Sequence, residues 1–171
     1  MAQTSTSTRI LGIDPGLNIT GYGVIDILGH QQIEIVEAGV VRSKRKDEFQ
    51  TRLASIYDGV FDVIESLKPD CMGLEELYSH YERPKTSIIM GHARGVICLA
   101  ASKHKLPIQH YAATQVKRVL TGNGRAPKDQ IQLSVARHLG LDEVPKPADV
   151  ADALAIALTH HYLSFRPDGL L

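Results

Sequence analysis

Apolar runs and amphipathic stretches alternate along this chain in an order typical of a layered α/β domain. Three short runs rich in Ile and Val come first, separated by turn-forming Pro-Gly and Leu-Gly-His clusters. They cover residues 9–14, 21–28 and 32–42. Runs of this length and composition with turns between them predict an antiparallel meander of three strands.

Apolar side chains then recur with helical spacing in two segments. From 47 to 67 they fall three or four residues apart, which predicts one buried helical stripe ended by Pro69. Residues 86–103 repeat this spacing and place Gly91 and Gly95 on one helical face. Small residues at such positions suit either internal packing against a sheet or a close contact between subunits. Both interpretations remain open from the sequence.

The remaining elements complete a mixed pattern. We expect strands at 71–77 and 106–111, a helix at 115–120 with Thr114 as N-cap and Gly122 as its stop, and a helix from Pro127 through Leu139 followed by Gly140. A last helix is expected from about 147 to 163. A meander followed by crossovers predicts an α/β domain over 9–164, built on a five-stranded mixed sheet with helices on both faces. Polar residues 1–8 are expected to form a disordered tail, and 165–171 a second tail.

Composition restricts the class of protein further. The chain has 171 residues, 43% apolar and 22% charged, which fits one globular domain and excludes extended disorder and disulfide scaffolds. The apolar stretch 88–101 is too short to span a bilayer, and the first residues lack a secretory signal, so we expect a cytoplasmic protein. Cys71 and Cys98 lack CxxC spacing and are expected to be reduced thiols.

The charges are unevenly distributed although the net charge is zero. Ten basic residues and a single acid lie between Arg83 and Arg137, so this segment carries +9 and the rest of the chain −9. Such a division is typical of a basic binding face combined with an acidic pocket. Solvated helix faces that happen to cluster would give the same pattern.

Carboxylates stand at the ends of three predicted elements. Asp14 ends an apolar strand, Glu75 and Glu76 end another, and Asp149 and Asp152 lie three residues apart in the first turn of an otherwise apolar helix. Turn formation and helix-dipole stabilisation are simpler reasons for acids at these positions. A set of this kind also suits Mg²⁺ or Mn²⁺, and two such ions about 3.5 to 4 Å apart support phosphodiester hydrolysis. Because side chains alternate along a strand, Glu75 and Glu76 must point to opposite faces.

A basic loop follows the predicted helix at 115–120. Two glycines with an asparagine between them, at 122–124, are flanked by four cations: Lys117, Arg118, Arg125 and Lys128. Backbone N–H groups and cations at such a loop suit phosphate contacts, whereas the simpler interpretation is an ordinary surface turn.

Other chemistries receive less support from the sequence. His160 and His161 are adjacent, so they point apart on a helix and do not suit a zinc site. The chain contains no GxGxxG or GxxxxGK[ST] loop. The GIDPG and TGYG motifs also resemble the phosphate loop of actin-like ATPases, but those proteins need two such domains, and 171 residues do not supply them.

Taken together, the motifs resemble the RuvC family of bacterial Holliday-junction resolvases, whose fold is RNase H-like. The resemblance runs from about Arg9 to Leu163. It is carried by LGIDPGLNITGYGV (11–24), GLEELY (73–78), GHARGV (91–96), QVKRVLTGNGRAPKDQ (115–130) and ADVADALAIALTH (148–160). The segment SHYERPK at 79–85 departs from the family pattern because it lacks the usual asparagine and carries Glu82 and Pro84.

The resemblance implies roles for particular residues. It implies that the catalytic metal-binding carboxylates are Asp14, Glu75, Asp149 and Asp152, and thereby selects Glu75 over Glu76. It places Lys117 and Lys128 near the scissile phosphates and Tyr78 in contact with the junction. It also implies a homodimer that nicks two opposed strands, with Gly91 and Gly95 in the dimer contact, and RuvA and RuvB as partners. An RNA-processing nuclease of the same fold and a junction-binding scaffold are the alternative functions.

Overall fold

A computed structural model describes residues 7–29, 32–77 and 84–164. Five strands form one mixed sheet in the order β3-β2-β1-β4-β5. The strands are β1 (Thr8–Asp14), β2 (Ile19–Leu28), β3 (Gln32–Arg42), β4 (Cys71–Glu75) and β5 (Ile108–Tyr111). The first three pair antiparallel as a meander, and β4 and β5 lie parallel to β1. The mixed sheet expected from the sequence is confirmed.

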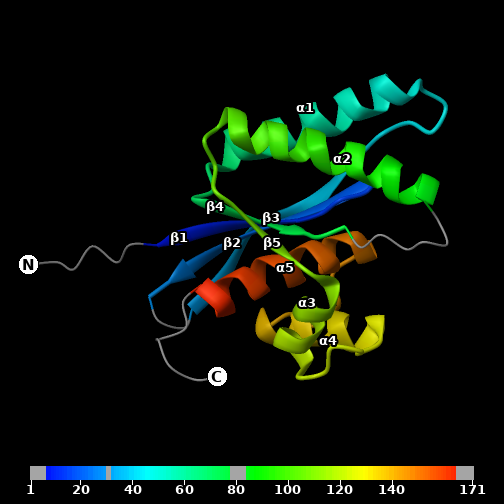
Figure 1. The fold of residues 1–171 in the computed structure, drawn as a ribbon. Coiled ribbons are helices and arrows are strands. Elements are labelled where there is room, and N and C mark those ends of the chain that lie inside the picture. Colours follow the sequence, from blue (N-terminus) through cyan, green and yellow to red (C-terminus); the bar gives the residue numbers. More distant parts are fainter. Residues whose placement is uncertain (1–6, 30–31, 78–83, 165–171) are drawn as a thin grey trace, which may run out of the picture.

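Helices cover both faces of the sheet, as expected (Figure 1). On one face lie α1 (Phe49–Leu67) and α2 (Pro84–Lys103). On the other lie α3 (Ala113–Thr121), α4 (Lys128–His138) and α5 (Ala148–Ser164). No helix within the described residues is long and apolar enough to cross a membrane.

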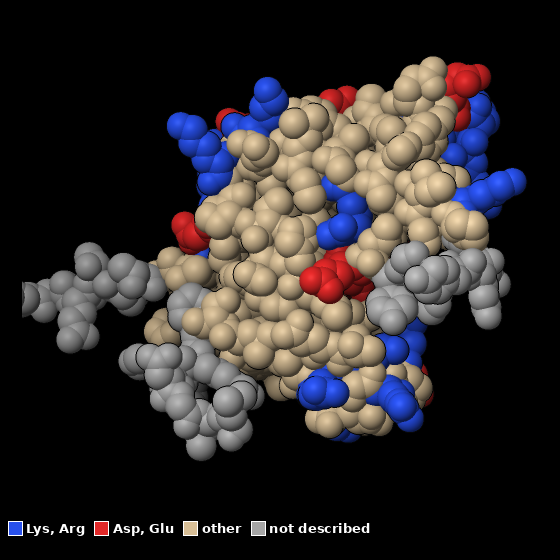
Figure 2. Space-filling model, viewed as in Figure 1, with Lys and Arg blue, Asp and Glu red and all other residues tan. Residues whose placement is uncertain are grey.

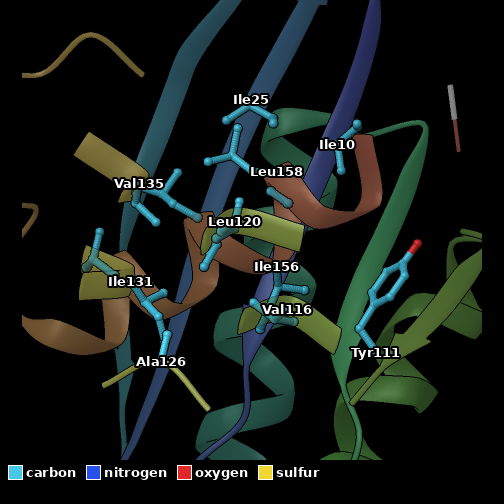
Figure 3. Close-up of a cluster of buried hydrophobic side chains, with 14 of the residues drawn as sticks. Ile10, Ile25, Tyr111, Val116, Leu120, Ala126, Ile131, Val135, Ile156 and Leu158 are labelled. Carbon is cyan, nitrogen blue, oxygen red and sulfur yellow. The ribbon is translucent and has the colours of Figure 1, made fainter. Parts of the chain in front are cut away.

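Strand alternation divides the core into two apolar layers. Leu11 and Ile13 of β1 pack against the α1 and α2 side, whereas Ile10 packs on the α5 side. Figure 3 shows the second layer, where Ile10 and Ile25 of the sheet meet Leu158 of α5. Each fully buried side chain of this size stabilises the fold by roughly 1.5 to 3 kcal/mol. Both faces of β1 are therefore buried, which explains why its sequence is almost continuously apolar.

Glycines in the sheet let α5 lie directly on the backbone of the strands. A Cβ at Gly12 of β1 would overlap the carbonyl oxygen of Ala153, and a Cβ at Gly21 of β2 would overlap that of Asp149. At Gly73 of β4 it would come within 3.0 Å of the Ile156 side chain. Only glycine permits this approach, which brings the first turns of α5 to the carboxyl end of β1.

Strand boundaries differ from the sequence prediction by a few residues. Thr8, assigned above to the N-terminal tail, is the first residue of β1, and β2 begins two residues earlier than expected. Strand β4 ends at Glu75 instead of 77, and β5 begins at 108 instead of 106. Pro107 precedes β5 and has no N–H group to donate to a strand ladder.

Helix boundaries also shift, and one capping assignment is wrong. Thr114 lies inside α3, and the N-cap is Ala112, because β5 passes into α3 through this one residue. Helix α1 begins at 49 instead of 47, and α2 begins at 84 instead of 86. Gly122 ends α3 with φ of 75°, and Gly140 follows α4 with φ of 64°, so both predicted glycine stops are confirmed.

Candidate metal and nucleic-acid site

Asp14 and Glu75 end two neighbouring parallel strands. The strand register pairs Ile13 with Leu74, the residues directly before them. Because the side-chain period is two, Asp14 shares a face with Gly12 and Glu75 shares one with Gly73, and both glycines contact α5. The two carboxyl groups therefore point to the α5 side of the sheet.

Glu76 follows the last residue of β4, so the strand alternation expected from the sequence does not extend to it. Its side chain is exposed, whereas Glu75 is half-buried. The sheet therefore distinguishes two adjacent acids that periodicity alone left equivalent. Of the two, Glu75 is the one that lines a cleft.

The cleft lies between the sheet end and three helices and has a volume of about 250 Å³. Its lining combines three acids, two lysines and an apolar floor. The residues are Asp14, Glu75, Ala113, Val116, Lys117, Lys128, Ile131, Asp152, Ala155 and Ile156. Helix α5 contributes Asp152, so residues from opposite ends of the chain meet here. Asp149, one turn earlier, is half-buried and does not line the cleft, although its charge acts on Asp14.

Burial and like charge control the protonation of these acids. Burial, followed by the charges of Glu75 and Asp152, raises the pKa of Asp14 well above its ordinary range. Burial also raises the pKa of Glu75, against the opposing effect of a hydrogen bond with Asp14 and of the nearby Lys117 and Lys128. The Asp14 and Glu75 carboxyl groups thus form a coupled pair that shares a proton more readily than it carries two negative charges.

Two lysines bring positive charge to the same cleft. The Nζ atom of Lys128 lies 2.7 Å from Oδ2 of Asp152, and this contact raises the pKa of Lys128. Lys117, from α3, lines the cleft beside Glu75 and makes no ion pair among the contacts of the described residues. On the face of the molecule drawn in Figure 2, acidic atoms lie near the middle, with Lys or Arg atoms above and below them.

The other two predicted cations lie outside the cleft. Arg118 and Arg125 are exposed on the loop side of α3 and α4. The backbone N–H of Arg125 donates to Oδ1 of Asn123 at 2.9 Å, and Thr121 bonds the same loop. These local bonds give the loop a defined shape and leave both guanidinium groups on the surface.

The donor set suits a hard divalent cation. Carboxylate oxygens are the ligands that Mg²⁺ and Mn²⁺ prefer, and a cation would remove the repulsion that raises the pKa of Asp14. Among the described residues, however, no three Asp, Glu, His or Cys side chains already stand close enough to hold one ion together. Lys128 contacts Oδ2 of Asp152, so this ion pair engages one of the two oxygen atoms of that carboxylate.

Among the described residues, no atom lies within 4 Å of a Cβ placed on Gly95 of α2, and a Cβ on Gly91 meets Leu77 at 3.9 Å. In this part of the chain Gly95 does not pack against the sheet, and its place in a dimer contact stays a prediction. An exposed stripe runs along the same side of α2 through Ile88, His92, Gly95 and Leu99. The stripe is exposed because the buried face of α2 is formed by other residues, such as Ala93 and Ile97.

One contact at the site was not predictable from the local sequence. Arg94 of α2 donates to the carbonyl oxygen of Glu75, at 2.9 Å. The GHARGV motif contained this arginine, but nothing in the local sequence indicates a bond to a distant strand. Tyr78, the aromatic residue expected to contact DNA, and residues 79–83 of the divergent segment lie outside the described residues.

The sheet order, with carboxylates at the ends of β1 and β4 and on a final helix that crosses the sheet, defines a nuclease of the RNase H-like fold. A sequence model of one family, described as crossover junction endodeoxyribonuclease RuvC, matches residues 10–160. The chain belongs to the RuvC family of crossover junction endodeoxyribonucleases.

Similar proteins support this assignment along nearly the whole chain. Crossover junction endodeoxyribonuclease RuvC of Rhodopirellula baltica is 54% identical over 166 residues, which cover 97% of this chain and 93% of the relative. The structure of Thermus thermophilus RuvC matches with a TM-score of 0.84 at 33% identity, covering 92% of this chain and 95% of the other. The Thermus thermophilus protein in complex with Holliday junction substrate matches with a TM-score of 0.85 at 32% identity, covering 92% and 94%.

Proposed function

We propose that this protein resolves four-way DNA junctions by paired nicks in opposed strands, with Asp14, Glu75, Asp149 and Asp152 holding Mg²⁺ or Mn²⁺, two ions per subunit. The observation that carries the proposal is the meeting of three half-buried acids and two lysines in one cleft. The solved complex of the Thermus thermophilus relative with Holliday junction substrate supports the choice of DNA.

The acidic and basic residues at the cleft have different roles in the proposed reaction. The acids repel a phosphodiester, so the backbone of DNA can enter only when cations neutralise them. Lys117 and Lys128 lie beside the acids and are placed to contact the phosphates next to the cleaved bond. Arg118 and Arg125 extend the same basic surface outwards. When bound, a pair of divalent ions supplies activation of the attacking water and stabilises the leaving 3′ oxygen.

Two adjacent glutamates allow a sharp test. Glu75→Gln removes the carboxylate that lines the cleft, and Glu76→Gln removes its exposed neighbour with the same loss of charge. We expect Glu75→Gln to lose more than about 100-fold in nicking rate while junction binding stays close to wild type, and Glu76→Gln to behave as wild type. Labelled four-way junction, linear duplex and structured RNA, each with and without Mg²⁺ or Mn²⁺, are the substrates.

Each alternative has its own outcome in this experiment. Cleavage of structured RNA in preference to the junction would favour the RNA-processing nuclease. Tight junction binding without nicking, with either metal, would favour the scaffold. Equal loss in both glutamine variants would remove Glu75 from the metal site.

We also propose that the exposed stripe of α2 is the contact of a homodimer. Coordinated cleavage of two strands related by a two-fold axis needs two clefts with the same symmetry. Gly95 lets two helix backbones approach closely, and Ile88 and Leu99 supply apolar surface beside it, 61% and 49% exposed. Gly95→Leu is expected to separate the dimer or uncouple the nicks while the far-UV spectrum stays that of a folded protein. A variant that sediments as a dimer and makes paired nicks at the wild-type rate would contradict this.

The partners stay a prediction from the resemblance, and the compartment stays a prediction from the sequence pattern. RuvA and RuvB are expected to deliver the junction, and the cytoplasm is the expected compartment. Co-sedimentation of the purified chain with each partner on a four-way junction tests the first expectation directly.

A further inference from the structure

Arg94 connects helix α2 to the end of strand β4. Its Nε donates to the backbone oxygen of Glu75 at 2.9 Å, and its Nη2 donates to Nδ1 of His110, in β5, at 2.9 Å. The residue is half-buried, in contrast to the exposed Lys103 at the end of the same helix. One guanidinium group therefore joins a helix to two neighbouring strands.

The peptide group between Glu75, a proposed metal ligand, and Glu76 is hydrogen-bonded at both its oxygen and its nitrogen. The N–H of Glu76 donates to the carbonyl oxygen of Tyr111 at 2.8 Å, so β5 holds this peptide through its nitrogen. Arg94 holds the same peptide through its oxygen, which belongs to Glu75. Glu75 is also the last residue of β4 and pairs with Tyr111 of β5. The plane of the peptide group after Glu75 is set by the ψ angle of that residue, so holding this plane helps to set the direction of the Glu75 side chain.

The hydrogen bonds of Arg94 favour a structural role over phosphate binding. Two of its nitrogen atoms already donate to protein acceptors, and one acceptor is a backbone carbonyl that belongs to the site. Hydrogen bonds from a charged donor are roughly twice as strong as neutral ones, and the planar guanidinium orients two acceptors at once. Lysine can supply the charge and N–H donors, but all of them are on one nitrogen atom, so it lacks the planar fork.

We propose that Arg94 is a positioning residue that holds the end of β4 so that the Glu75 carboxylate is ready to bind the metal. The inference rests on the proposed role of Glu75 as a ligand.

The test compares Arg94→Met and Arg94→Lys with Lys103→Met, which removes a charge from the same helix without touching β4. Mn²⁺ binding is measured on the DNA-free protein by electron paramagnetic resonance of the free ion, and single-turnover nicking and junction binding are measured separately. We expect Arg94→Met to weaken Mn²⁺ binding about 10-fold and slow nicking between about 10- and 100-fold, with junction affinity unchanged, because misplacing a reacting group by about 1 Å has effects of this size. The Mn²⁺ affinity and nicking rate of Arg94→Lys should fall between those of Arg94→Met and those of Lys103→Met.

A double mutant separates positioning from a general structural effect. If Arg94 acts through Glu75, then adding Arg94→Met to Glu75→Gln produces no further loss of Mn²⁺ affinity. Additive losses would overturn the proposal, as would junction binding that falls in step with nicking, because Arg94 would then contact DNA. If Arg94→Met does not fold, Arg94→Lys decides, and Mn²⁺ affinity and nicking equal to wild type overturn the proposal.

The two proposals fail in different ways. If Glu75→Gln keeps wild-type Mn²⁺ affinity and nicking, the assigned metal site is wrong. If Glu75→Gln loses both while Arg94→Met matches Lys103→Met, the site is right and Arg94 does not position it.

Discussion

Two carboxylates, one near each end of strand β1, lie in opposite electrostatic surroundings. At its start, Arg9 lies directly opposite Asp26 of β2 in the strand register. Nε of Arg9 donates to Oδ1 of Asp26 at 2.7 Å, and Nη2 donates to Oδ2 at 2.8 Å. This fork lowers the pKa of Asp26 below its ordinary value. At the other end, burial and neighbouring acids raise the pKa of Asp14.

The difference comes from burial and from the partners together. Burial is the largest cause of the raised pKa of Asp14, whereas the hydrogen bond from Arg9 is the largest cause of the lowered pKa of Asp26. Among the described residues, neither Asp14 nor Glu75 makes an ion pair with an arginine or lysine. A paired acid stabilises the fold, whereas acids held together without a cation lower the stability of the protein that carries them. Acids held together without a cation are expected at a site that binds a cation from solution.

The largest expected effect separates function from stability at Asp14. Asp14→Asn removes a repelled charge from the cleft and keeps the shape of the side chain. We expect nicking to fall more than about 100-fold, while the free energy of unfolding at pH 7 stays equal or rises by about 1 kcal/mol. Urea unfolding and junction nicking on one preparation measure both. A folded variant that nicks normally would show that Asp14 belongs to the turn alone.

The reverse result is expected at Asp26. Asp26→Asn removes the negative charge that accepts two hydrogen bonds from Arg9, at the end of β1 away from the cleft. We expect the free energy of unfolding to fall by about 1 to 2 kcal/mol, with single-turnover nicking of the folded fraction unchanged. Urea unfolding measures the loss. A nicking defect without loss of stability would end the contrast between the two ends of β1.

A smaller effect concerns the cations of the acidic end. Lys117→Ala and Lys128→Ala should each weaken junction binding and reduce the slope of log K against log[salt] by about 0.9, if each removes one phosphate contact. Lys103→Ala, on the other side of the sheet, is the matched control. Gel shifts at several salt concentrations measure the slope, and an unchanged slope in both cleft variants would restore the surface-turn interpretation of the basic loop.

The smallest effect is the pH dependence of stability, which has opposite signs at the two ends. The pKa of Asp26 is lowered in the folded protein, so its contribution is present above the unfolded pKa near 4 and is lost as pH falls through the folded value. The pKa of Asp14 is raised, so its penalty is present at neutral pH and shrinks as pH falls towards about 4. The stability advantage of Asp14→Asn should therefore be largest at pH 8 and small at pH 5, and an advantage that does not change with pH would contradict the repulsion. Thermal unfolding across this range, without metal, measures it.

Much of the fold could be predicted from local pattern. Strand runs, helical stripes and the glycine stops at Gly122 and Gly140 appear where expected, because turns, caps and alternating burial act over a few residues. The errors lie at element ends, such as Thr114 inside α3 and Pro107 ahead of β5, where the neighbouring element decides the boundary. The acids at element ends were also visible, since a carboxylate closing an apolar strand is unusual.

By itself, the sequence determined that Asp14 shares a face of its strand with Gly12, and Glu75 one with Gly73, because side-chain alternation is a property of any strand. Only the tertiary structure decided which face carries the site, because α5 packs on the side of Gly12 and Gly73 and brings Asp152 over that side. The same long-range packing produced the contacts of Lys128 with Asp152 and of Arg94 with Glu75. Periodicity is a short-range property and gives relative directions, whereas the meeting of distant charges depends on how closely a helix can approach a sheet.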